Sequence, residues 1–340
     1  MTVVNEWGKL RKVVLGNIEP TDFIHGVQFS DPTFITQFTQ VCRTTLDDLE
    51  RTRKFLELGG VEVVQPQASL PPSKDMCLPP INPRDNILQY KDHTLIAHPT
   101  IVHHRPASEL IAETITNTKK KIFENKATYV ANWDTWQPLD EDGPLYETAN
   151  VLRMGLDILI TGDHERFGNA LGYIEFSKWV EEVEPKATIF EVKGTTGHLD
   201  GNLFIVKPGL VLVYDDTIEL PGDMAKWDKI IVDKNLKPRT QVLKGLEHME
   251  KTKYNPVFTK LWFEWLNSNI NETAFSLNAL NLGNDIVAFP CYNKDIFDKL
   301  EKGYKIECIN LDLKAIEYWD QGLHCITSEL DREGELEHII

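Results

Sequence analysis

Cysteine is scarce in this sequence and is arranged without pattern. The five cysteines of the 340-residue chain form no CxxC pair and show no regular spacing. This argues against a disulfide framework and against a zinc site, so we expect no metal ion. Glycine-rich phosphate loops are missing too, because neither GxGxxG nor GxxxxGKS occurs, and nucleotide binding is therefore not expected.

Basic residues and long apolar runs are also in short supply. The 36 Lys and Arg residues face 52 Asp and Glu residues, a formal net charge of −16, which argues against a nucleic-acid or anionic membrane partner. No apolar run approaches the roughly 20 residues that span a bilayer. The opening MTVVNEWGKL has neither the basic start nor the apolar middle of a signal peptide. We expect a cytoplasmic protein whose acidic character suits a cationic small substrate, and the sequence leaves a homodimer open.

The sequence does contain a structural pattern that recurs five times. The first unit places a helical segment, 38–60, between predicted strands at 10–16 and 61–66. Each of the other four units starts with a predicted strand pair, continues with a helical or short middle segment and closes with a strand. The opening segments are 86–99, 150–163, 202–216 and 274–290; the middle segments are 107–126, 166–185, 223–227 and 293–303; the closing strands are 127–133, 186–194, 229–234 and 304–311.

Units of two strands, a helix and a third strand favour a closed, cyclic α/β architecture. One unit alone leaves a sheet face and a strand edge uncovered, and closing the ring covers both. An ordinary open α/β sheet is the alternative, but it would alternate single strands with helices rather than begin its units with hairpins. We expect one domain that spans residues 1–340.

Polar side chains concentrate where the predicted strands begin or end. Each of them alone has an ordinary structural explanation, as a turn residue, a loop residue or a small buried thiol. The pair His198 and Asp200 is more suggestive, because residues two apart in extended backbone face the same side. A reactive site is therefore a hypothesis that depends on the whole set. The segments are NPRDN (82–86), YETAN (146–150), GTTGHLDGN (194–202) and GLHCITSEL (322–330).

Taken in order, these segments make the chain resemble the glycine and inosamine-phosphate amidinotransferases. That family belongs to the guanidine-modifying (pentein) superfamily, which also contains arginine and agmatine deiminases and dimethylarginine hydrolase. The resemblance implies a five-bladed, pseudo-symmetric α/β propeller of ββαβ modules around a central pocket, which agrees with the five units. The matching motifs are NEWGKLRKVVLG, NPRDN, YETANVLRMGLDIL, GHLDGNLF and GLHCITSEL, in an order that covers nearly the whole chain.

The resemblance also implies roles for the residues at the matching positions. Cys325 would be the nucleophile, His198 the general acid and base, and Glu147 the carboxylate that orients His198. Further candidates would contact the substrate, with two carboxylates gripping its guanidinium group. These candidates are Asp85, Asp200, Asn278 and Arg84.

The chemistry of a guanidinium group suits those residue types. Two carboxylates hydrogen-bonded to its N–H groups would fix its plane and retain its positive charge, which favours attack on the central carbon. Attack by a thiolate and protonation of the departing amine by histidine would leave an amidino-cysteine. The expected activity is transfer of the amidino group of L-arginine to an amine acceptor, with release of ornithine and with no cofactor.

Two alternatives to amidino transfer stay open at this point. Water in place of the amine would make the enzyme a guanidine hydrolase, and Glu147 favours this, because the amidinotransferases carry Asp at the matching position and the hydrolases carry Glu. An inactive propeller that serves as a binding module is a third hypothesis, although every reactive position is filled. The acceptor stays unidentified, since the segment 210–220 lacks the arginine that holds the carboxylate of glycine in relatives that use it.

Overall fold

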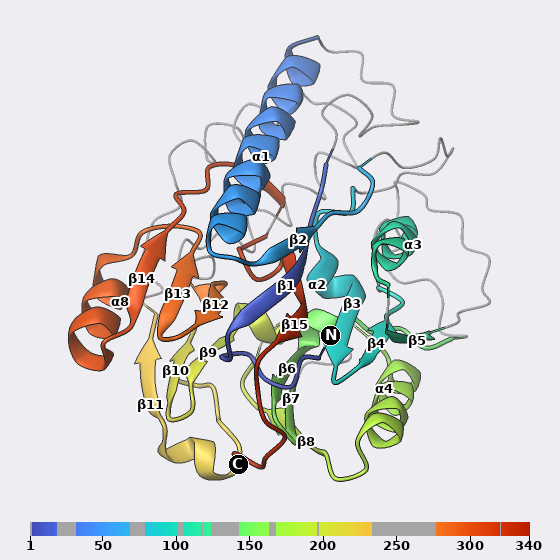
Figure 1. The fold of residues 1–340 in the computed structure, drawn as a ribbon, viewed down its shortest axis with the longest axis vertical. Helices are drawn as coiled ribbons and strands as arrows, with labels where there is room; N and C mark the ends of the chain where they lie inside the picture. The colour runs from blue at the N-terminus through green and yellow to red at the C-terminus, as the bar shows by residue number, and fades with distance from the viewer. Residues whose placement is uncertain are drawn as a thin grey trace.

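The fold consists of five three-stranded sheets arranged around a common centre (Figure 1). The computed structural model describes residues 2–18, 32–68, 79–100, 105–116, 118–123, 143–162, 168–195, 197–232, 277–319 and 321–340. Every sheet has the same connectivity, because its middle strand pairs antiparallel with one neighbour and parallel with the other. This repeated ββαβ arrangement confirms the predicted α/β propeller.

Four blades are continuous in the sequence. In each, two strands form a hairpin, a helix or helical turn follows, and the third strand returns parallel to the second. The blades comprise β3 (Ile87–Tyr90), β4 (His93–Ile96), α3 (Arg105–Thr114) and β5 (Lys119–Ile122); β6 (Val151–Met154), β7 (Asp157–Thr161), α4 (Ala170–Val183) and β8 (Thr188–Val192); β9 (Leu203–Lys207), β10 (Leu210–Val213), η4 (Gly222–Lys226) and β11 (Asp228–Ile231); and β12 (Leu280–Gly283), β13 (Ile286–Phe289), α8 (Lys294–Asp298), the π-helical turn η5 (Lys299–Tyr304) and β14 (Glu307–Asn310).

The remaining blade joins the two ends of the described chain. Strand β1 (Leu10–Leu15), helix α1 (Pro32–Leu58) and β2 (Glu62–Val64) come from the amino-terminal part. Their sheet is completed by β15 (Thr327–Arg332), which pairs antiparallel with β1. The sequence pattern had assigned the first unit a closing strand, 61–66, but no hairpin partner for 10–16. Closure of the ring by β15 removes that open edge.

Local sequence explains where the elements turn and begin. The hairpins turn through two residues, and positive φ angles occur where this is needed, as at Gly155 (φ 76°) and at Asn284 and Asp285 (φ 54° and 59°). Helix α4 begins at Asn169, whose side chain accepts a hydrogen bond from the Gly172 amide at 2.8 Å. Helix α1 ends at Gly59 and Gly60, as its sequence predicts.

One predicted helix is wrong in extent. The segment 107–126 was expected to be helical throughout, but α3 ends at Thr114, and Lys119–Ile122 forms β5, parallel to β4. Lysine-rich KKKI suits a helix surface by propensity, yet here it supplies a largely exposed outer strand, where lysines protect the edge. The predicted closing strand at 127–133 lies outside the described residues.

The core lies between sheets and helices and also between neighbouring blades. The first strands of the four continuous blades are almost wholly buried, whereas the outer strands β5 and β11 are mostly exposed. Buried aromatic side chains fill the space under α4, where Tyr146 stacks on Phe176 at 4.9 Å between ring centroids. Among the described residues, none of the helices combines the length and apolar character required to traverse a bilayer.

Candidate active site

Each first strand is preceded by a short turn; four of these turns carry the polar segments of the sequence, and the fifth carries the candidate Asn278. The five turns are α2 (Pro83–Asn86), η2 (Thr148–Asn150), η3 (Leu199–Gly201), the turn at 277–278 and the turn at 322–326. The turn α2 contacts η2, and η2 contacts η3. Equivalent positions in a ring of blades meet near its centre, so residues more than 240 positions apart in sequence become neighbours, as Arg84 and Cys325 do.

His198 and Glu147 form a close pair. The His198 Nε2 lies 2.6 Å from Glu147 Oε2. The other oxygen of Glu147 accepts hydrogen bonds from the backbone amide of Thr100, at 2.9 Å, and from its hydroxyl group. Glu147 is fully buried, so its orientation is fixed on both sides. Burial opposes the charged imidazole, but Asp85 and Glu147 outweigh this and raise the pKa of His198 to about 10.

Asp85 lies on the other side of the same imidazole. Its Oδ1 is 3.8 Å from His198 Nδ1, and its Oδ2 accepts a hydrogen bond from the Asn82 side chain. Burial raises the pKa of Asp85 to about 7, and the carboxylates of Glu147 and Asp200 add to this effect. The site thus holds several acids close enough that their ionisation is interdependent.

Cys325 is buried beside an amide and a carboxylate. Its Sγ lies 3.0 Å from Asn278 Nδ2 and 3.4 Å from Asp200 Oδ2. The Cys325 backbone amide donates to Asn278 Oδ1 at 2.9 Å, so one asparagine side chain contacts both ends of the residue. Burial, together with the negative charges of Asp200 and Asp85, raises the pKa of the Cys325 thiol well above its usual value. In the free protein at neutral pH this residue is a thiol.

Asp200 is the residue that connects the nucleophile to the rest of the site. It is 2% exposed, and its Oδ2 contacts both Cys325 Sγ and His324 Nδ1, the latter at 2.9 Å. Among the described residues, Asp200 Oδ1 has no hydrogen-bond partner. Burial opposes ionisation, but the hydrogen bond and charge of His324 lower the pKa of Asp200 below its usual value. One carboxylate oxygen is therefore fixed and the other is available.

The side chain of Arg84 lies apart from this group, and its predicted contact with the substrate stays a prediction. Its guanidinium is fully buried, forms an ion pair with Glu329 and donates to the Thr327 carbonyl at 3.3 Å. Arg84 is adjacent to Asp85 in a helical turn, so the two side chains leave the turn in different directions. This placement gives Arg84 a structural role and argues against a direct substrate contact.

Two residues of the site were missed or misjudged in the sequence. Strand alternation would point His324 away from its neighbour Cys325, but 322–326 is a turn and His324 contacts Asp200. The second residue is Glu6, in the opening NEWGKL segment. Its Oε2 lies 3.5 Å from His324 Nε2. The one available signal was that both residues fall inside the quoted motifs.

Histidine and carboxylate groups approach each other closely in two places, as metal ligands do. The sets are Asp85, Glu147 and His198, and Glu6, His324 and Glu329; the potential ligand atoms of each set lie within 4.8 Å of one another. In the second set, Glu329 already pairs with the guanidinium groups of Arg84, Arg153 and Arg332. Those positive charges oppose a bound cation. In the first set the imidazole itself takes the place of the cation between two carboxylates.

Known proteins resemble this chain in sequence and in fold. No family model matches the sequence. A Streptomyces griseus protein named "Putative inosamine-phosphate amidinotransferase 2" is 27% identical over 270 residues, covering 67% of this chain and 74% of that protein.

Solved structures show the same fold over the full length. Inosamine-phosphate amidinotransferase StrB1 from Streptomyces griseus aligns with a TM-score of 0.67 at 19% identity, covering 99% of this chain and 98% of that one. SxtG, an amidinotransferase from Microseira wollei, aligns with a TM-score of 0.69 at 16% identity over 100% and 99%. DDAH from Pseudomonas aeruginosa aligns with a TM-score of 0.60 at 13% identity over 95% and 100%. The chain is therefore similar in sequence to a putative inosamine-phosphate amidinotransferase, and it has the fold of amidinotransferases and of DDAH.

Proposed function

We propose that the protein transfers the amidino group of L-arginine to an acceptor amine through a covalent intermediate on Cys325. The observation that carries the proposal is the position of Asp200, whose carboxylate lies 3.4 Å from Cys325 Sγ and has its second oxygen available among the described residues. A guanidinium N–H bonded to that oxygen would place the central carbon of the substrate near the thiol. Asp85, on the far side of His198, supplies the second carboxylate.

The charges of the site favour a cation over a neutral ligand. Asp85, Glu147 and Asp200 are buried and face one imidazole. A guanidinium group would offset the surplus of negative charge, and its N–H groups would form charge-assisted hydrogen bonds. The same positive charge would lower the pKa of the Cys325 thiol, so the thiol proton is released to solvent as the substrate binds.

The first half-reaction follows from the protonation state of His198. The thiolate attacks the central carbon, and a C–S bond forms. His198, which is protonated at neutral pH by virtue of its raised pKa, gives its proton to the δ-nitrogen of arginine. The C–N bond to that nitrogen then breaks, ornithine leaves and the amidino group stays on Cys325.

The second half-reaction reverses these steps with a different amine. Neutral His198 accepts a proton from the entering amine as its nitrogen attacks the amidino carbon. The C–S bond breaks, and the thiolate and the imidazolium are restored. This is a ping-pong sequence in which donor and acceptor occupy the same place in turn.

Hydrolysis is the competing function, and Glu147 is the observation that favours it, since guanidine hydrolases carry Glu at this position. Water in place of the amine would convert the same intermediate into a urea-type product. A hydrolase that forms ornithine and urea would share every step up to the amidino-cysteine and differ only in what reaches the intermediate. A hydrolase that forms citrulline would instead expel ammonia in the first step and keep the ornithine part attached to the carbon on Cys325.

Product analysis separates the candidates. The protein is incubated with L-arginine, alone and with a panel of amines, and ornithine, citrulline, urea and ammonia are measured. Ornithine that appears only with an amine supports transfer. Ornithine with urea, or citrulline with ammonia, formed without an amine supports hydrolysis. No turnover together with no adduct on Cys325 contradicts both and supports the inactive binding module.

Two variants test the assigned roles. Cys325→Ala is expected to abolish the adduct, which intact-protein mass spectrometry detects as a mass increase in the wild-type protein. His198→Asn is expected to bind L-arginine without turning it over, because the proton for the departing amine is lost. A fully active Cys325→Ala protein would rule out the covalent mechanism.

A further inference from the structure

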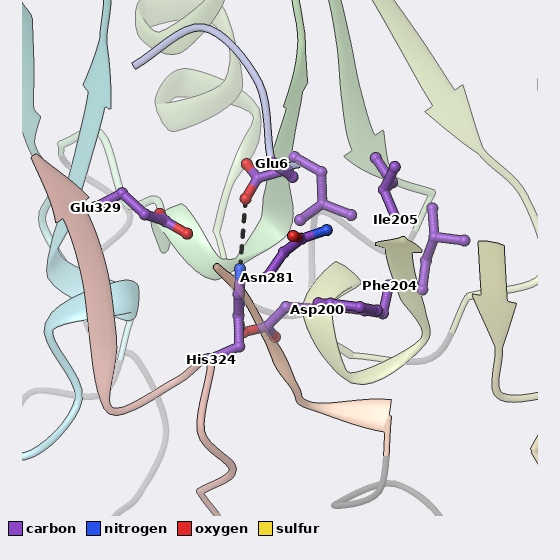
Figure 2. Close-up of a pocket in the computed structure, with 9 residues that line it drawn as sticks. Glu6, Asp200, Phe204, Ile205, Asn281, His324 and Glu329 are labelled. Carbon is purple, nitrogen blue, oxygen red and sulfur yellow. Dashed lines mark hydrogen bonds and ion pairs between the residues drawn. The ribbon is translucent and has the colours of Figure 1, made fainter. Parts of the chain in front are cut away.

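His324 lies between two buried carboxylates. Its Nδ1 is 2.9 Å from Asp200 Oδ2, and its Nε2 is 3.5 Å from Glu6 Oε2. Figure 2 shows the imidazole edge-on between η3 and the amino-terminal segment that carries Glu6. The imidazole is almost completely buried, at 5% exposure of the side chain. An imidazole with a carboxylate oxygen at each nitrogen donates to both only in its doubly protonated form.

The surroundings of His324 favour that charged form. Asp200 on η3 and Glu6 on the amino-terminal segment attract the charge, while burial and Arg84 on α2 oppose it; the balance raises the pKa of His324 above its ordinary value. Glu329 on β15 is the remaining acid nearby, and it is occupied by arginines. The positive charge on His324 in turn holds the pKa of Asp200 down.

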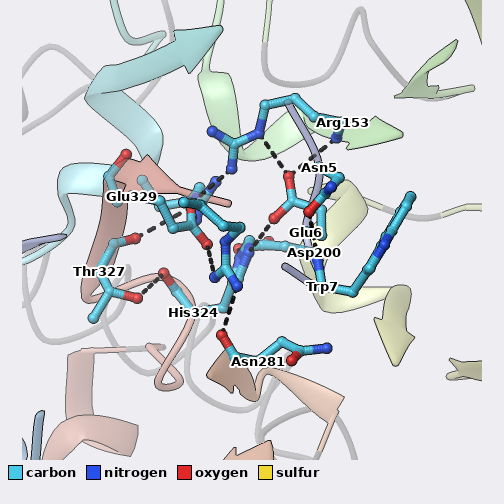
Figure 3. A network of polar contacts seen from close by, with 12 residues as sticks. Asn5, Glu6, Trp7, Arg153, Asp200, Asn281, His324, Thr327 and Glu329 are labelled. Carbon is cyan, nitrogen blue, oxygen red and sulfur yellow. Dashed lines mark hydrogen bonds and ion pairs between the residues drawn. The ribbon is translucent and has the colours of Figure 1, made fainter. Parts of the chain in front are cut away.

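Glu6 is itself held in place, so the contact with His324 is not a loose one. Glu6 Oε1 accepts from Arg153 Nε at 2.7 Å and from the Arg153 backbone amide at 3.0 Å. Arg153 also donates to Glu329 at 2.6 Å. Figure 3 shows these contacts as one continuous network that ends at Asp200. A rigid support therefore extends from the centre of the molecule to the carboxylate beside the nucleophile.

We propose that His324 is a positioning residue: as an imidazolium clamped between Glu6 and Asp200, it fixes Oδ2 of Asp200, keeps that carboxylate ionised and leaves Oδ1 to receive the guanidinium group. The inference rests on the proposed function, since it specifies how the cation-binding carboxylate is prepared. His324 does not touch the reacting atoms in this role. Its effect reaches the substrate through Asp200.

A small cavity beside His324 is consistent with a support rather than a second substrate site. It has a volume of about 10 Å³, room for about one water molecule. Glu6, Asp200, Asn281, His324 and Glu329 contribute the polar part of its lining. No organic ligand fits there, so the groups around it serve one another.

The test measures L-arginine binding as a function of pH in a Cys325→Ala background, where arginine is not consumed. Two further changes are compared: His324→Asn, whose amide nitrogen replaces the Nδ1 donor without the charge, and His324→Leu, which removes donor and charge. Both are expected to weaken binding, His324→Leu by about tenfold or more, as for loss of a charge-assisted hydrogen bond. At each pH, the dissociation constant of each variant is divided by that of the parent. Asp85 is present in both proteins, so its own titration affects both constants alike and drops out of the ratio.

The pH dependence of that ratio distinguishes positioning from a general loss of structure. Without the imidazolium, the pKa of Asp200 rises, so the ratio is expected to grow as pH falls from about 8 to about 6. His324→Asn should bind nearly as the parent does at the upper pH. The matched control is His338→Asn, because His338 also contacts a buried carboxylate, with Nδ1 2.7 Å from Asp157 Oδ1, but away from Cys325. Its ratio should stay flat.

A flat ratio for both His324 variants, with the parent binding arginine, would overturn the inference alone. A parent that does not bind arginine would overturn the proposed function as well. If thermal unfolding shows that His324→Leu does not fold, the same ratios are measured for His324→Asn and Glu6→Gln, and these two variants decide the test. Glu6→Gln removes one of the two charges that hold the imidazolium and should shift the ratio in the same direction to a smaller extent.

Discussion

Cys325 is unusual for a proposed nucleophile because its neighbours disfavour the thiolate. Burial and the carboxylates of Asp200 and Asp85 raise the pKa of its thiol, whereas a reactive cysteine is ordinarily found near positive charge. The arrangement makes sense if the substrate brings the positive charge. The free enzyme would then be protected from neutral electrophiles and would become nucleophilic only when a cation is bound.

This argument predicts that alkylation of Cys325 depends on the charge of the reagent. Chloroacetamidine and chloroacetamide have nearly the same size, but only the first is a cation at neutral pH. We expect chloroacetamidine to modify Cys325 faster, by about tenfold or more, because its charge substitutes for that of a guanidinium. Mass spectrometry of the modified peptide measures both rates. Equal rates in the folded protein, with Cys291 as an internal reference, would contradict substrate-assisted ionisation.

Asp85 makes substrate binding depend on pH in a predictable direction. Its pKa is raised to about 7, so it is neutral below that pH and anionic above it. A guanidinium needs the anion, and binding of L-arginine to the Cys325→Ala protein is therefore expected to tighten as pH rises through about 7. Calorimetric titration across this range tests the point. In the double variant Cys325→Ala, Asp85→Asn the step near that pH should be absent; a midpoint near the ordinary aspartate value in the parent would show that burial does not control Asp85.

At the residue scale, the sequence predicts which residues take part better than how they are connected. Cys325, His198, Glu147, Asp85 and Asp200 lie in short polar motifs, and the structure brings all five to one region. The contact between His324 and Asp200 joins positions 124 apart. It depends on the turn before β15, and no local pattern encodes it.

At the scale of elements, the site consists of equivalent turns rather than of one loop. The turn at 322–326 is packed directly against the turn at 277–278: the amides of Leu323 and Cys325 donate to the carbonyl oxygen and to Oδ1 of Asn278, each at 2.9 Å. Gly322 allows this approach, because a Cβ atom there would overlap the Asn278 side chain. The glycine three residues before the proposed nucleophile thus has a specific steric reason.

Gly322→Ala is therefore expected to lower kcat without unfolding the protein. The added methyl group would push Asn278 away from Cys325 Sγ, and a displacement of about 1 Å at a reactive group costs up to about a hundredfold in rate. Steady-state kinetics and thermal unfolding are measured together. Gly303→Ala is the matched control, because no atom lies within 4 Å of the position that its Cβ would take; equal kcat values for the two variants would contradict the steric argument.

Elements with strong local patterns were predicted well, and elements defined by a distant partner were not. The hairpins at 86–99 and 202–216 combine alternation or apolar runs with a tight turn, and both are present. Strand β5 was taken for a helix because its lysines carry no strand signal, and its pairing with β4 decides its conformation. Strand β15 was not among the predicted strands, since its partner β1 lies more than 300 residues away.

At the scale of the whole molecule, one buried acid ties the blades together. Glu329 on β15 accepts from Arg84 on α2, from Arg153 on β6 at 2.6 Å and from Arg332 at 3.2 Å. Arg332 also donates to the carbonyl of Asn281 on β12 at 2.8 Å, and Asn281 Nδ2 donates to the carbonyl of Val206 on β9 at 2.5 Å. All five blades thus take part in one polar network at the centre of the ring.

Loss of the charge on Glu329 should therefore destabilise the entire ring. Glu329→Gln leaves three buried guanidinium groups with one carboxylate fewer, and breaking a buried ion pair in this way costs about 3–5 kcal/mol. We expect a lower midpoint of urea unfolding, whereas the exposed control Asp223→Asn, which removes a surface partner of Lys226, should leave it unchanged.

The pH dependence of that difference has a definite sign. The pKa of Glu329 in the folded state lies well below its ordinary value, chiefly because Arg84 and Arg153 outweigh the effect of burial. Its contribution to stability is fully present above the ordinary glutamate pKa of about 4.3 and is lost as pH falls toward the folded value. The free-energy difference between wild type and Glu329→Gln should be constant near neutral pH and should shrink under acid. A difference that grows under acid, or a Gln variant as stable as wild type, would mean that the arginines are neutralised by other groups and that Glu329 does not hold the ring.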